Sequence, residues 1–598
     1  MSATPSAPNS GREHVERAEC IPDLLRARAA ESPDAVPLVV DGGEALSYAE
    51  WESRSDAVAR GLAERGIRPG ERVALLFDND RWTDYAVCYL GVHKAGAAAV
   101  PLGRRFTGPE LEQVLDHSGA SGVVAPEGFS PPPGGGWAAR PEELEADQRA
   151  EPFPSRGRAG GLAEIIYTSG TTGSPKGVAC SHASLVFYDL PADPSGGQPP
   201  AVVMAHAFPV GTNAGQECLR LPLRQAGRTA VVLPLFDPAR LCAVIEERGV
   251  TRLQLVPAMA QMLLTSGAVE RHDVSSVERV TLSSAPAPPA LLSRLSDAFP
   301  NASVWNAYAL TESGSARSLM RHDEARPGSV GRPVGQTEVR VVGEDGEDAP
   351  AGSTGEVWLR RRGAPRREYY RDPAATAAAF SGDWLRTGDL GYLDGDGYLY
   401  LVDRLKDVII SGGLNVSSVE VENVLHEHPD VLEAAVFGMD HPVLGQDVAA
   451  AVVTRGSSGA RDLQAFVRRR LGEHKVPRRL FLVEGLPRNE SGKVLKRVLR
   501  ERFATEPVPA EEAAPLGEVQ ETVASIWRDV LHVEEAGVEA DFFDLGGHSL
   551  AAAQVVARLR DAFHVELPVT AVFEWPTVRE LAAAVEDARL AASEAGRG

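Results

Sequence analysis

The stretch Tyr167-Thr-Ser-Gly-Thr-Thr-Gly-Ser-Pro-Lys-Gly-Val178 decides how the rest of the chain is organised. An apolar run, residues 165–167, reads as a strand that enters a loop. In such a loop, glycines let backbone N–H groups approach an anion, hydroxyls donate to it, and a lysine neutralises it. The stretch therefore predicts a phosphate-binding loop rather than a plain polar turn, although Pro175 stands where a Walker A loop has its second glycine. The residues that fit this use are Thr168, Ser169, Gly170, Thr171, Thr172, Gly173 and Lys176.

Length and composition indicate a globular protein with several domains. The chain has 598 residues, of which 43% are hydrophobic and 24% charged. The formal net charge of −22 argues against nucleic-acid binding through a general basic surface. The five cysteines show no metal spacing and no paired pattern, so we expect a reducing compartment and a cytoplasmic protein. We see no signal peptide and no apolar run of about 18 residues, so no membrane span is expected.

Apolar runs and helical stretches alternate along most of the chain. Residues 73–77 and 228–233 read as buried strands, and residues 94–102 read as a helix end that passes into a strand. Residues 432–438 and 448–453 are the expected strands of a smaller domain farther on. Such alternation predicts α/β layers in which helices pack on sheets.

The stretch at 303–312 contains a candidate metal site. A short apolar strand there ends in Tyr308, Thr311 and Glu312. A carboxylate at a strand end, near a phosphate loop, suits Mg²⁺, which prefers oxygen ligands and keeps several waters. A solvated glutamate is the simpler interpretation of Glu312 taken alone.

Further motifs follow farther along the chain. Asp389 lies in a Thr-Gly-Asp turn and could accept both hydroxyls of a ribose, although such a turn is a weak signal taken alone. Lys406, in the stretch 403–413, reads as an exposed linker lysine when taken alone. Gly492 permits a turn that projects Lys493.

The last part of the chain reads as a separate small helical unit. Residues 504–515 are acidic, rich in proline and poor in large apolar residues, as in a linker. Residues 519–531 carry apolar side chains at helical spacing. Ser549, after Gly546 and Gly547, falls at the expected start of another helix. An N-cap role would suit this serine, but would not explain the two glycines, the histidine and the flanking aromatics.

Six motifs in this order resemble the adenylate-forming superfamily of acyl-CoA synthetases, luciferases and adenylation domains of nonribosomal peptide synthetases. The segment around Ser549 resembles a peptidyl carrier domain. The resemblance covers nearly the whole chain and implies an α/β adenylate-forming fold with a large N-terminal and a small C-terminal subdomain, followed by a small all-α four-helix carrier domain. The boundaries that we expect are 1–20 tail, 21–403 large subdomain, 404–503 small subdomain, 504–515 linker, 516–590 carrier and 591–598 tail.

The resemblance also implies roles for single residues. The loop from Thr168 to Lys176 would hold the ATP phosphates, and Glu312 would reach Mg²⁺. Lys493 would be the catalytic lysine, which the sequence alone does not separate from its neighbours Lys496 and Arg497. The nucleotide residues would be Tyr308, which stacks on adenine although Ala309 replaces the family's glycine, with Thr311, Asp389 for the ribose, and Arg404. Residues 403–413 would form a hinge between the subdomains, to which Lys406 would belong. Ser549 would receive 4′-phosphopantetheine.

We therefore expect an acid–AMP ligase that activates a carboxylic acid as acyl-AMP and loads it onto its own carrier, in nonribosomal peptide or polyketide secondary metabolism such as antibiotic biosynthesis. An acyl-CoA synthetase with an incidental tail and a catalytically silent carrier scaffold are the alternatives. The expected partners are a phosphopantetheinyl transferase and a downstream synthetase, ketosynthase or tailoring enzyme, without nucleic acid or membrane.

The segment after the phosphate loop predicts the substrate class. By resemblance, residues 205–213 correspond to the loop in which amino-acid adenylation domains carry an aspartate for the substrate ammonium. Ala207 stands there instead, beside His206 as the gating aromatic, so an aryl or short acyl acid is expected and a β-amino or other amino acid is the reserve. Glu217 could still meet an amine placed farther along the substrate. The expected pocket residues are His206, Ala207, Gly211, Ser284, Ala307 and Ser315, with Thr212 and Asn213 as possible further members.

Overall fold

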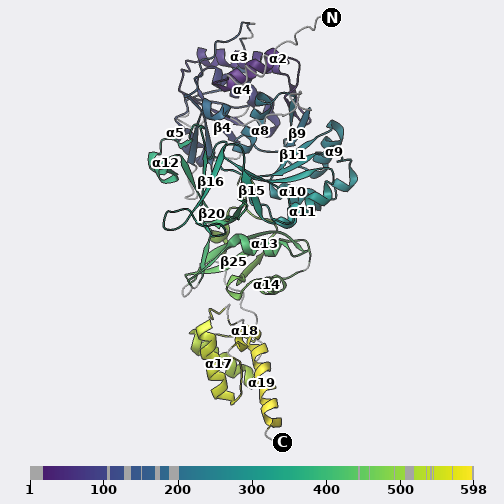
Figure 1. Ribbon diagram of the computed structural model, residues 1–598, viewed down its shortest axis with the longest axis vertical. Coiled ribbons are helices and arrows are strands. Elements are labelled where there is room, and N and C mark those ends of the chain that lie inside the picture. Colours follow the sequence, from purple (N-terminus) through teal and green to yellow (C-terminus); the bar gives the residue numbers. More distant parts are fainter. Residues whose placement is uncertain are drawn as a thin grey trace. The chain divides into compact units, whose positions relative to one another are not determined.

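The chain divides into two compact units, each described here by itself. The first contains Met1–Lys406 and Arg488–Val494, and the second contains Asp407–Pro487 and Leu495–Gly598. The division thus falls within the segment interpreted as a hinge. The computed structural model (Figure 1) describes residues 18–103, 108–126, 136–147, 149, 151–168, 176–187, 201–411, 413–441, 445–456, 458–489, 492–504, 517–533, 535–538, 542, 545–547, 549–568 and 570–595.

The first unit is built on two sheets. The larger has the order β16-β17-β20-β21-β15-β14-β13-β12-β11-β9-β10-β1-β2, with β19 beside β20. Its strands are β1 (Leu38–Val40), β2 (Ala45–Leu46), β9 (Val202–His206), β10 (Arg228–Val232), β11 (Arg252–Leu255), β12 (Arg279–Leu282), β13 (Ser303–Tyr308), β14 (Ser318–Arg321), β15 (Ser329–Pro333), β16 (Thr337–Val342), β17 (Gly355–Arg361), β19 (Phe380–Ser381), β20 (Trp384–Leu393) and β21 (Leu399–Arg404). Pairing is parallel from β1 through β10, β9, β11 and β12 to β13, and antiparallel beyond β13.

The second sheet of this unit carries the phosphate-loop strands, in the order β18-β8-β7-β4-β3-β5-β6. Its strands are β3 (Arg72–Phe77), β4 (Ala98–Gly103), β5 (Gly122–Val124), β6 (Trp137–Ala139), β7 (Leu162–Thr168), β8 (Lys176–Ser181) and β18 (Glu368–Tyr369). The helices of the unit are α2 (Ile21–Glu31), α3 (Tyr48–Glu64), α4 (Trp82–Lys94), α5 (Gly108–Ser118), α6 (Pro141–Leu144), α7 (His182–Val186), α8 (Asn213–Arg224), α9 (Pro238–Arg248), α10 (Pro257–Thr265), α11 (Pro289–Ala298) and α12 (Pro373–Ala379). The predicted α/β architecture is confirmed, including the strands at 73–77 and 228–233.

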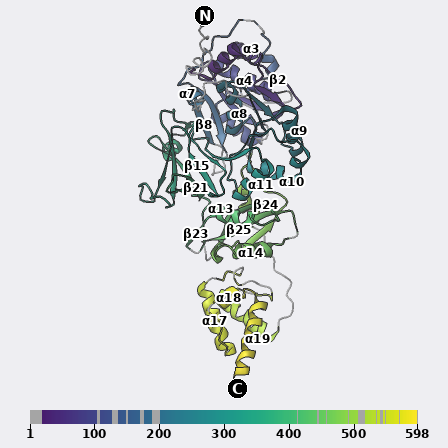
Figure 2. The ribbon, with the colours of Figure 1, turned by 45° about the vertical axis from the view of Figure 1, so that its right-hand side comes forward.

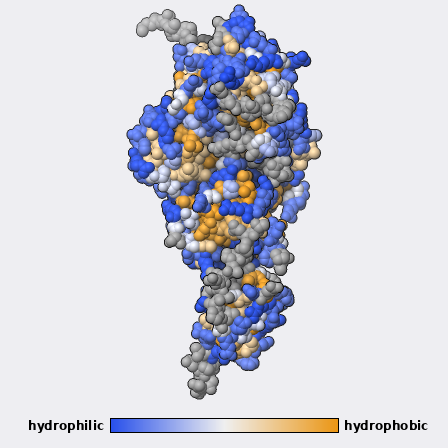
Figure 3. Space-filling view, turned by 180° about the vertical axis from the view of Figure 1, so that it is seen from behind, coloured by the Kyte–Doolittle hydropathy of each residue, from blue (hydrophilic) through white to orange (hydrophobic). Residues whose placement is uncertain are grey.

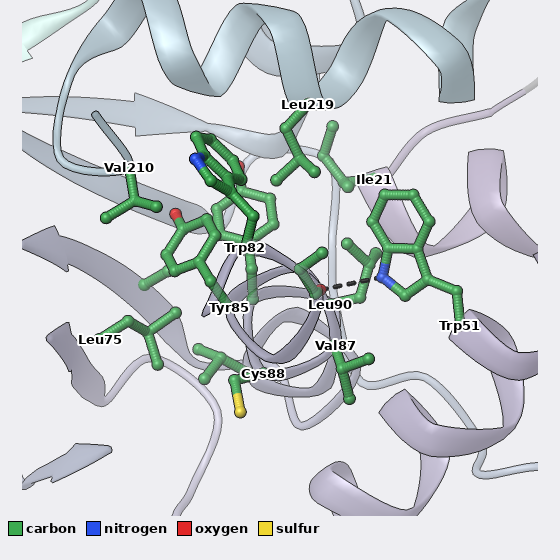
Figure 4. Packing of buried hydrophobic residues seen from close by; sticks show 14 of the residues in the cluster. Ile21, Trp51, Leu75, Trp82, Tyr85, Val87, Cys88, Leu90, Val210 and Leu219 are labelled. Atoms are coloured by element: carbon green, nitrogen blue, oxygen red, sulfur yellow. Dashed lines mark hydrogen bonds between the residues drawn. The ribbon is translucent and has the colours of Figure 1, made fainter. Parts of the chain in front are cut away.

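Helix α4 forms the centre of the largest apolar core. All of its residues are buried, as expected for a helix that is enclosed on every side. Figure 4 shows Trp82 and Tyr85 on this helix between side chains that come from α2, α3, β3 and α8. The indole N–H of Trp51 donates to the Ala86 carbonyl at 2.9 Å, so that buried donor is satisfied.

The second unit contains the small subdomain and the carrier segment (Figure 2). Its sheet has the order β23-β22-β25-β24, with β26 beside β25, and the strands expected at 432–438 and 448–453 are confirmed as parts of β24 and β25. The strands are β22 (Ile409–Ser411), β23 (Leu414–Val416), β24 (Val431–His441), β25 (Gly445–Thr454) and β26 (Arg479–Leu482). The helices are α13 (Ser418–His426), α14 (Ala460–Arg468), α15 (Lys496–Phe503), α16 (Glu518–Leu531), α17 (Ser549–Phe563), α18 (Ala571–Glu574) and α19 (Val578–Ala595).

The carrier segment has its own apolar core. Trp527 of α16 and Phe542 pack edge to face at 5.1 Å, surrounded by buried side chains of α17 and α19. Helix α19 extends to Ala595, past the boundary at 590, because residues 591–595 are alanine, serine and glutamate, which a helix tolerates well. Most of the predicted linker at 504–515 lies outside the described residues, as does most of the predicted tail at 1–20.

The face of the protein seen in Figure 3 is mostly polar. Figure 3 shows one face on which hydrophilic residues predominate and apolar residues gather in limited areas. None of the described helices combines the length and the apolarity that a bilayer crossing requires. The most exposed large apolar side chains in the described part of the chain are Val36, Leu235, Met262, Leu405, Ile410, Leu414 and Leu482.

A buried ion pair joins the second sheet of the first unit to helix α8. Arg220 of α8 contacts Glu164 of β7 at 2.9 Å, and both side chains are completely inaccessible to solvent. Tyr89 of α4 donates to the same carboxylate at 2.8 Å, and a second carboxylate, Glu217, contacts Arg220 at 2.7 Å. Two buried charges are stable together only when both are paired and hydrogen-bonded, as they are here.

We predict that Arg220→Met lowers the free energy of unfolding of the first unit by about 3–5 kcal/mol, because it leaves Glu164 charged and unpaired in the core. Urea unfolding followed by tryptophan fluorescence measures the change. Arg140→Met is the matched control, since Arg140 and Glu143 are 48% and 39% exposed in their ion pair and its loss should cost about 1 kcal/mol or less. Equal midpoints for the two variants would contradict the importance assigned to the buried pair.

Candidate active site

The phosphate-loop prediction falls on a hairpin between β7 and β8. The strands are antiparallel, and Thr168 and Lys176 are directly opposite each other. The loop between them therefore begins and ends at the same end of this strand pair. The predicted loop residues Ser169, Gly170, Thr171, Thr172 and Gly173 lie outside the described residues.

Three of the predicted nucleotide residues form one hydrogen-bonded cluster. The Tyr308 hydroxyl donates to one carboxylate oxygen of Asp389 at 2.6 Å, and the guanidinium of Arg404 contacts the other at 3.0 Å. Asp389 and Arg404 meet because they are opposite each other in the β20–β21 pair, while Tyr308 ends β13. Burial and the nearby carboxylate raise the pKa of Tyr308 well above its ordinary value, so its hydroxyl remains a donor.

The predicted metal ligand and the loop lysine both meet Tyr369. The Tyr369 hydroxyl donates to Glu312 at 2.8 Å, and the Lys176 ammonium lies 5.2 Å from the centre of the same ring. No cluster of three or more acidic, histidine or cysteine side chains that could hold a metal occurs among the described residues. Glu312 nevertheless fits Mg²⁺, which proteins often bind through one carboxylate together with substrate phosphates and water.

Arg367 ties the Glu312 segment to α8. Its guanidinium donates to the Thr311 carbonyl at 2.6 Å and to the Asn213 side chain at 3.1 Å, and the arginine is buried. Sequence reasoning missed both Arg367 and Tyr369. Their motif, Arg-Arg-Glu-Tyr-Tyr, has no spacing that indicates chemistry, and only the pairing of β18 with β8 brings it to the site.

His206 ends β9 and is buried between aromatic rings. Its ring lies 5.8 Å from Trp82, edge to face, and 5.6 Å from Phe208, stacked. The backbone N–H of Phe208 donates to Nδ1 at 3.2 Å, which leaves Nε2 as the protonated nitrogen of the neutral ring. Burial lowers the pKa of His206 to about 3, so the ring is uncharged at neutral pH. Ala207, next in the chain, is also buried.

The other expected pocket residues differ in exposure. Gly211 is buried, Ala307 and Ser315 are half-buried, and Ser284 is exposed with a left-handed φ of 70°. The Thr212 hydroxyl caps α8 by accepting from the Gly215 N–H at 3.1 Å.

Glu217 is committed to a structural role, in contrast to our expectation that it could meet a substrate amine. Its two oxygens contact Arg220 and Arg224, each at 2.7 Å. Burial would raise the pKa of Glu217, but Arg224 and Arg220 outweigh that effect and hold the pKa well below its ordinary range. A carboxylate with both oxygens in ion pairs is poorly suited to bind an ammonium group as well.

The lysine candidates of the C-terminal motif differ in their surroundings. Gly492 has a φ of +79°, and the Lys493 N–H donates to the Asn489 side chain at 2.8 Å, so Lys493 follows a closed turn. The ammonium of Lys496 instead contacts Glu422 at 2.8 Å and Ser418 at 2.7 Å. Lys406, at the end of the first unit, is exposed. The contacts of Lys496 favour a structural role for that lysine.

Ser549 is the first residue of α17, and its side chain lies outside the described part of the chain. The two positions before it that carry glycine require it for different reasons. Gly546 has a φ of +91°, and a Cβ on Gly547 would stand 2.3 Å from the Phe542 ring. The buried face of α17 includes Ala551, Ala552 and Val555, while Ala553 is only half-buried.

Comparison with known families agrees with this arrangement. The family model of the AMP-binding enzymes matches residues 25–370, that of the AMP-binding enzyme C-terminal domain matches 420–493, and that of the phosphopantetheine attachment site matches 521–585. A feruloyl-CoA synthase from Amycolatopsis is 34% identical over 493 residues, which are 80% of this chain and 97% of that protein. A plipastatin synthase polypeptide from Bacillus subtilis is 30% identical over 583 residues, which are 94% of this chain and 22% of that protein.

Solved structures show the same fold. The o-succinylbenzoate CoA synthetase from Bacillus subtilis, in complex with its acyl-adenylate intermediate, aligns with a TM-score of 0.72 and 28% identity, over 82% of this chain and 99% of that one. With a family model that matches more than half of the sequence, this chain belongs to the AMP-binding enzyme family, as an acid–AMP ligase fused to a phosphopantetheine-binding carrier domain.

Proposed function

We propose that the protein joins an aryl or short acyl acid to ATP and then loads the acyl group onto its own carrier domain, for use in nonribosomal peptide or polyketide biosynthesis in the cytoplasm. The observation that carries the proposal is the cluster of Tyr308, Asp389 and Arg404, which gathers a ring, an acceptor and a cation from three strands. Adenine stacking and ribose hydroxyls need groups of this kind.

The first half-reaction requires the acid carboxylate to attack the α-phosphate of ATP, with pyrophosphate as the leaving group. Charge develops on phosphate oxygens, so preorganised cations contribute most. In this proposal Lys176 and the loop at 168–173 hold the leaving phosphates, and Lys493 stabilises the α-phosphate and the acid. Glu312 holds Mg²⁺, which when bound neutralises phosphate charge.

The second half-reaction moves the acyl group to the carrier. We assign Ser549 as the attachment point of the phosphopantetheine arm, which supplies a thiol. Its position at the start of α17, after a constrained Gly-Gly turn, supports the assignment. A pivot around Lys406 would let the small subdomain exchange Lys493 for the arm. The boundary of the first unit at Lys406 supports the pivot, while Arg488–Val494, which include Lys493, group with the first unit. The partners are then a phosphopantetheinyl transferase and a downstream enzyme that takes the acyl group.

The substrate proposal rests on what surrounds His206. Ala207 offers no carboxylate, His206 is neutral, and Glu217 is already paired with arginines. A buried ammonium without a partner costs several kcal/mol, on the order of a thousandfold in binding. An acid without an amino group avoids this cost.

A CoA ligase is the second candidate, because a feruloyl-CoA synthase matches 80% of this chain over 97% of its own length. Comparing free CoA with the pantetheinylated carrier as acceptor distinguishes the two functions.

We predict that Lys493→Ala lowers acid-dependent ATP–pyrophosphate exchange by about 10²–10³-fold while ATP binding stays close to wild type, because one charge aimed at the reacting centre is lost. Lys496→Ala is the matched control, since that ammonium contacts Ser418 and Glu422, and it should keep most of the exchange rate. A reversal of the two results would transfer the catalytic role to Lys496.

Ser549→Ala is expected to retain pyrophosphate exchange and to lose all covalent loading. Intact-protein mass spectrometry after treatment with a phosphopantetheinyl transferase, ATP and acid measures the loading. Ser525→Ala, the same change within α16, should still be loaded. If the Ser549→Ala protein still carries the acyl group, the attachment site has been wrongly assigned.

The substrate prediction is tested with a panel of acids. Benzoates and short fatty acids should support pyrophosphate exchange, and proteinogenic α-amino acids should be weaker by roughly a thousandfold, for want of a partner for the ammonium. Strong exchange with any ordinary α-amino acid would show that another residue takes the role of the missing aspartate.

A further inference from the structure

Tyr369 stands between the two charged groups on which the proposed chemistry depends. Its hydroxyl donates to Glu312 at 2.8 Å, and its ring faces the Lys176 ammonium at 5.2 Å. Tyr369 is half-buried, and neither contact uses its backbone. One neutral side chain therefore contacts both the expected metal ligand and the expected phosphate-binding cation.

The backbone around Tyr369 is fixed on both sides. Tyr369 is opposite Val178 in the β18–β8 pair, and the N–H of Tyr370 donates to the Gly177 carbonyl at 2.8 Å. The Tyr369 N–H donates to the Thr376 hydroxyl at 3.0 Å. The strand that begins at Lys176 pairs with the strand that carries Tyr369. The sheet therefore fixes the distance between the backbone of Lys176 and that of Tyr369.

A neutral spacer has a chemical advantage over a direct ion pair at this place. If Lys176 and Glu312 paired with each other, each would neutralise the charge that the phosphates and the metal require. Within the described part of the chain Lys176 contacts no carboxylate, and Glu312 uses one oxygen for the phenol. A phenol orients a carboxylate through a charge-assisted hydrogen bond without cancelling its charge.

We propose that Tyr369 is a positioning residue for Mg²⁺ and phosphate binding, which orients Glu312 through its hydroxyl and supports Lys176 through its ring. This inference rests on the proposed role of Glu312 as the metal ligand. Groups that orient metal ligands in this way typically change metal affinity by about 10–100-fold when they are removed. Arg367, which holds the Thr311 carbonyl at 2.6 Å, fixes the backbone of the same segment, so the hydroxyl of Tyr369 acts on the carboxylate alone.

Tyr369→Phe in the full-length protein tests the role of the hydroxyl, because the ring remains. ATP binding is measured by calorimetry without acid at a series of Mg²⁺ concentrations. We expect the Mg²⁺ concentration for half-maximal enhancement of ATP binding to rise about 10–100-fold, with metal-free ATP binding unchanged within about twofold. Tyr369→Leu should in addition weaken metal-free ATP binding about twofold to fivefold, since the lysine loses the ring beneath it.

Tyr370→Phe is the matched control, because the hydroxyl of Tyr370 donates to the Ser118 carbonyl at 3.4 Å and not to Glu312, and it should keep the wild-type Mg²⁺ dependence. Glu312→Gln distinguishes the proposed role of Tyr369 from the proposed metal role of Glu312. A Mg²⁺ dependence that shifts in Glu312→Gln but not in Tyr369→Phe overturns the inference alone. A dependence that is wild-type in Glu312→Gln overturns the proposed metal role itself.

Discussion

The buried pair of Arg220 and Glu164 is the constraint on which the first unit depends. Glu164 lies on the strand that leads into the phosphate loop, and Arg220 lies on the helix that follows the His206 segment. Neither charge can be buried without the other, so β7 and α8 must pack together. The pair thus links the strand before the proposed phosphate loop to the helix after the proposed acid-binding segment, and Arg220 and Arg224 both contact Glu217.

The register of the paired strands places several of the other candidate site residues. The β20–β21 pair places Asp389 opposite Arg404, the β7–β8 pair closes the ends of the loop at Thr168 and Lys176, and the β18–β8 pair delivers Tyr369. Each of these contacts is set by backbone hydrogen bonds, and the side chains need few other supports. A site built in this way is more precisely held than one built on loops alone.

Sequence reasoning predicted the elements well because their signals are local. The apolar runs at β3, β7 and β13 and the helical spacing in α16 are short-range patterns that packing did not override. Sequence reasoning missed Tyr369 and Arg367 because their side chains contact residues more than fifty positions away in the chain. Glu217 was misjudged for a different reason, because the two arginines that hold it, Arg220 and Arg224, follow it closely on its own helix and the sequence reasoning did not consider them. The roles of the loop residues and of Lys493 remain predictions that the family resemblance supports.

The two partners of Asp389 have a consequence for nucleotide entry. One carboxylate oxygen accepts a hydrogen bond from Tyr308 and the other contacts Arg404, so the orientation of this carboxylate is already fixed. Each oxygen still has a second lone pair that can accept a hydrogen bond. A ribose that binds at this aspartate, as proposed, would therefore meet an acceptor that is oriented in advance, and little conformational entropy would be lost there on binding.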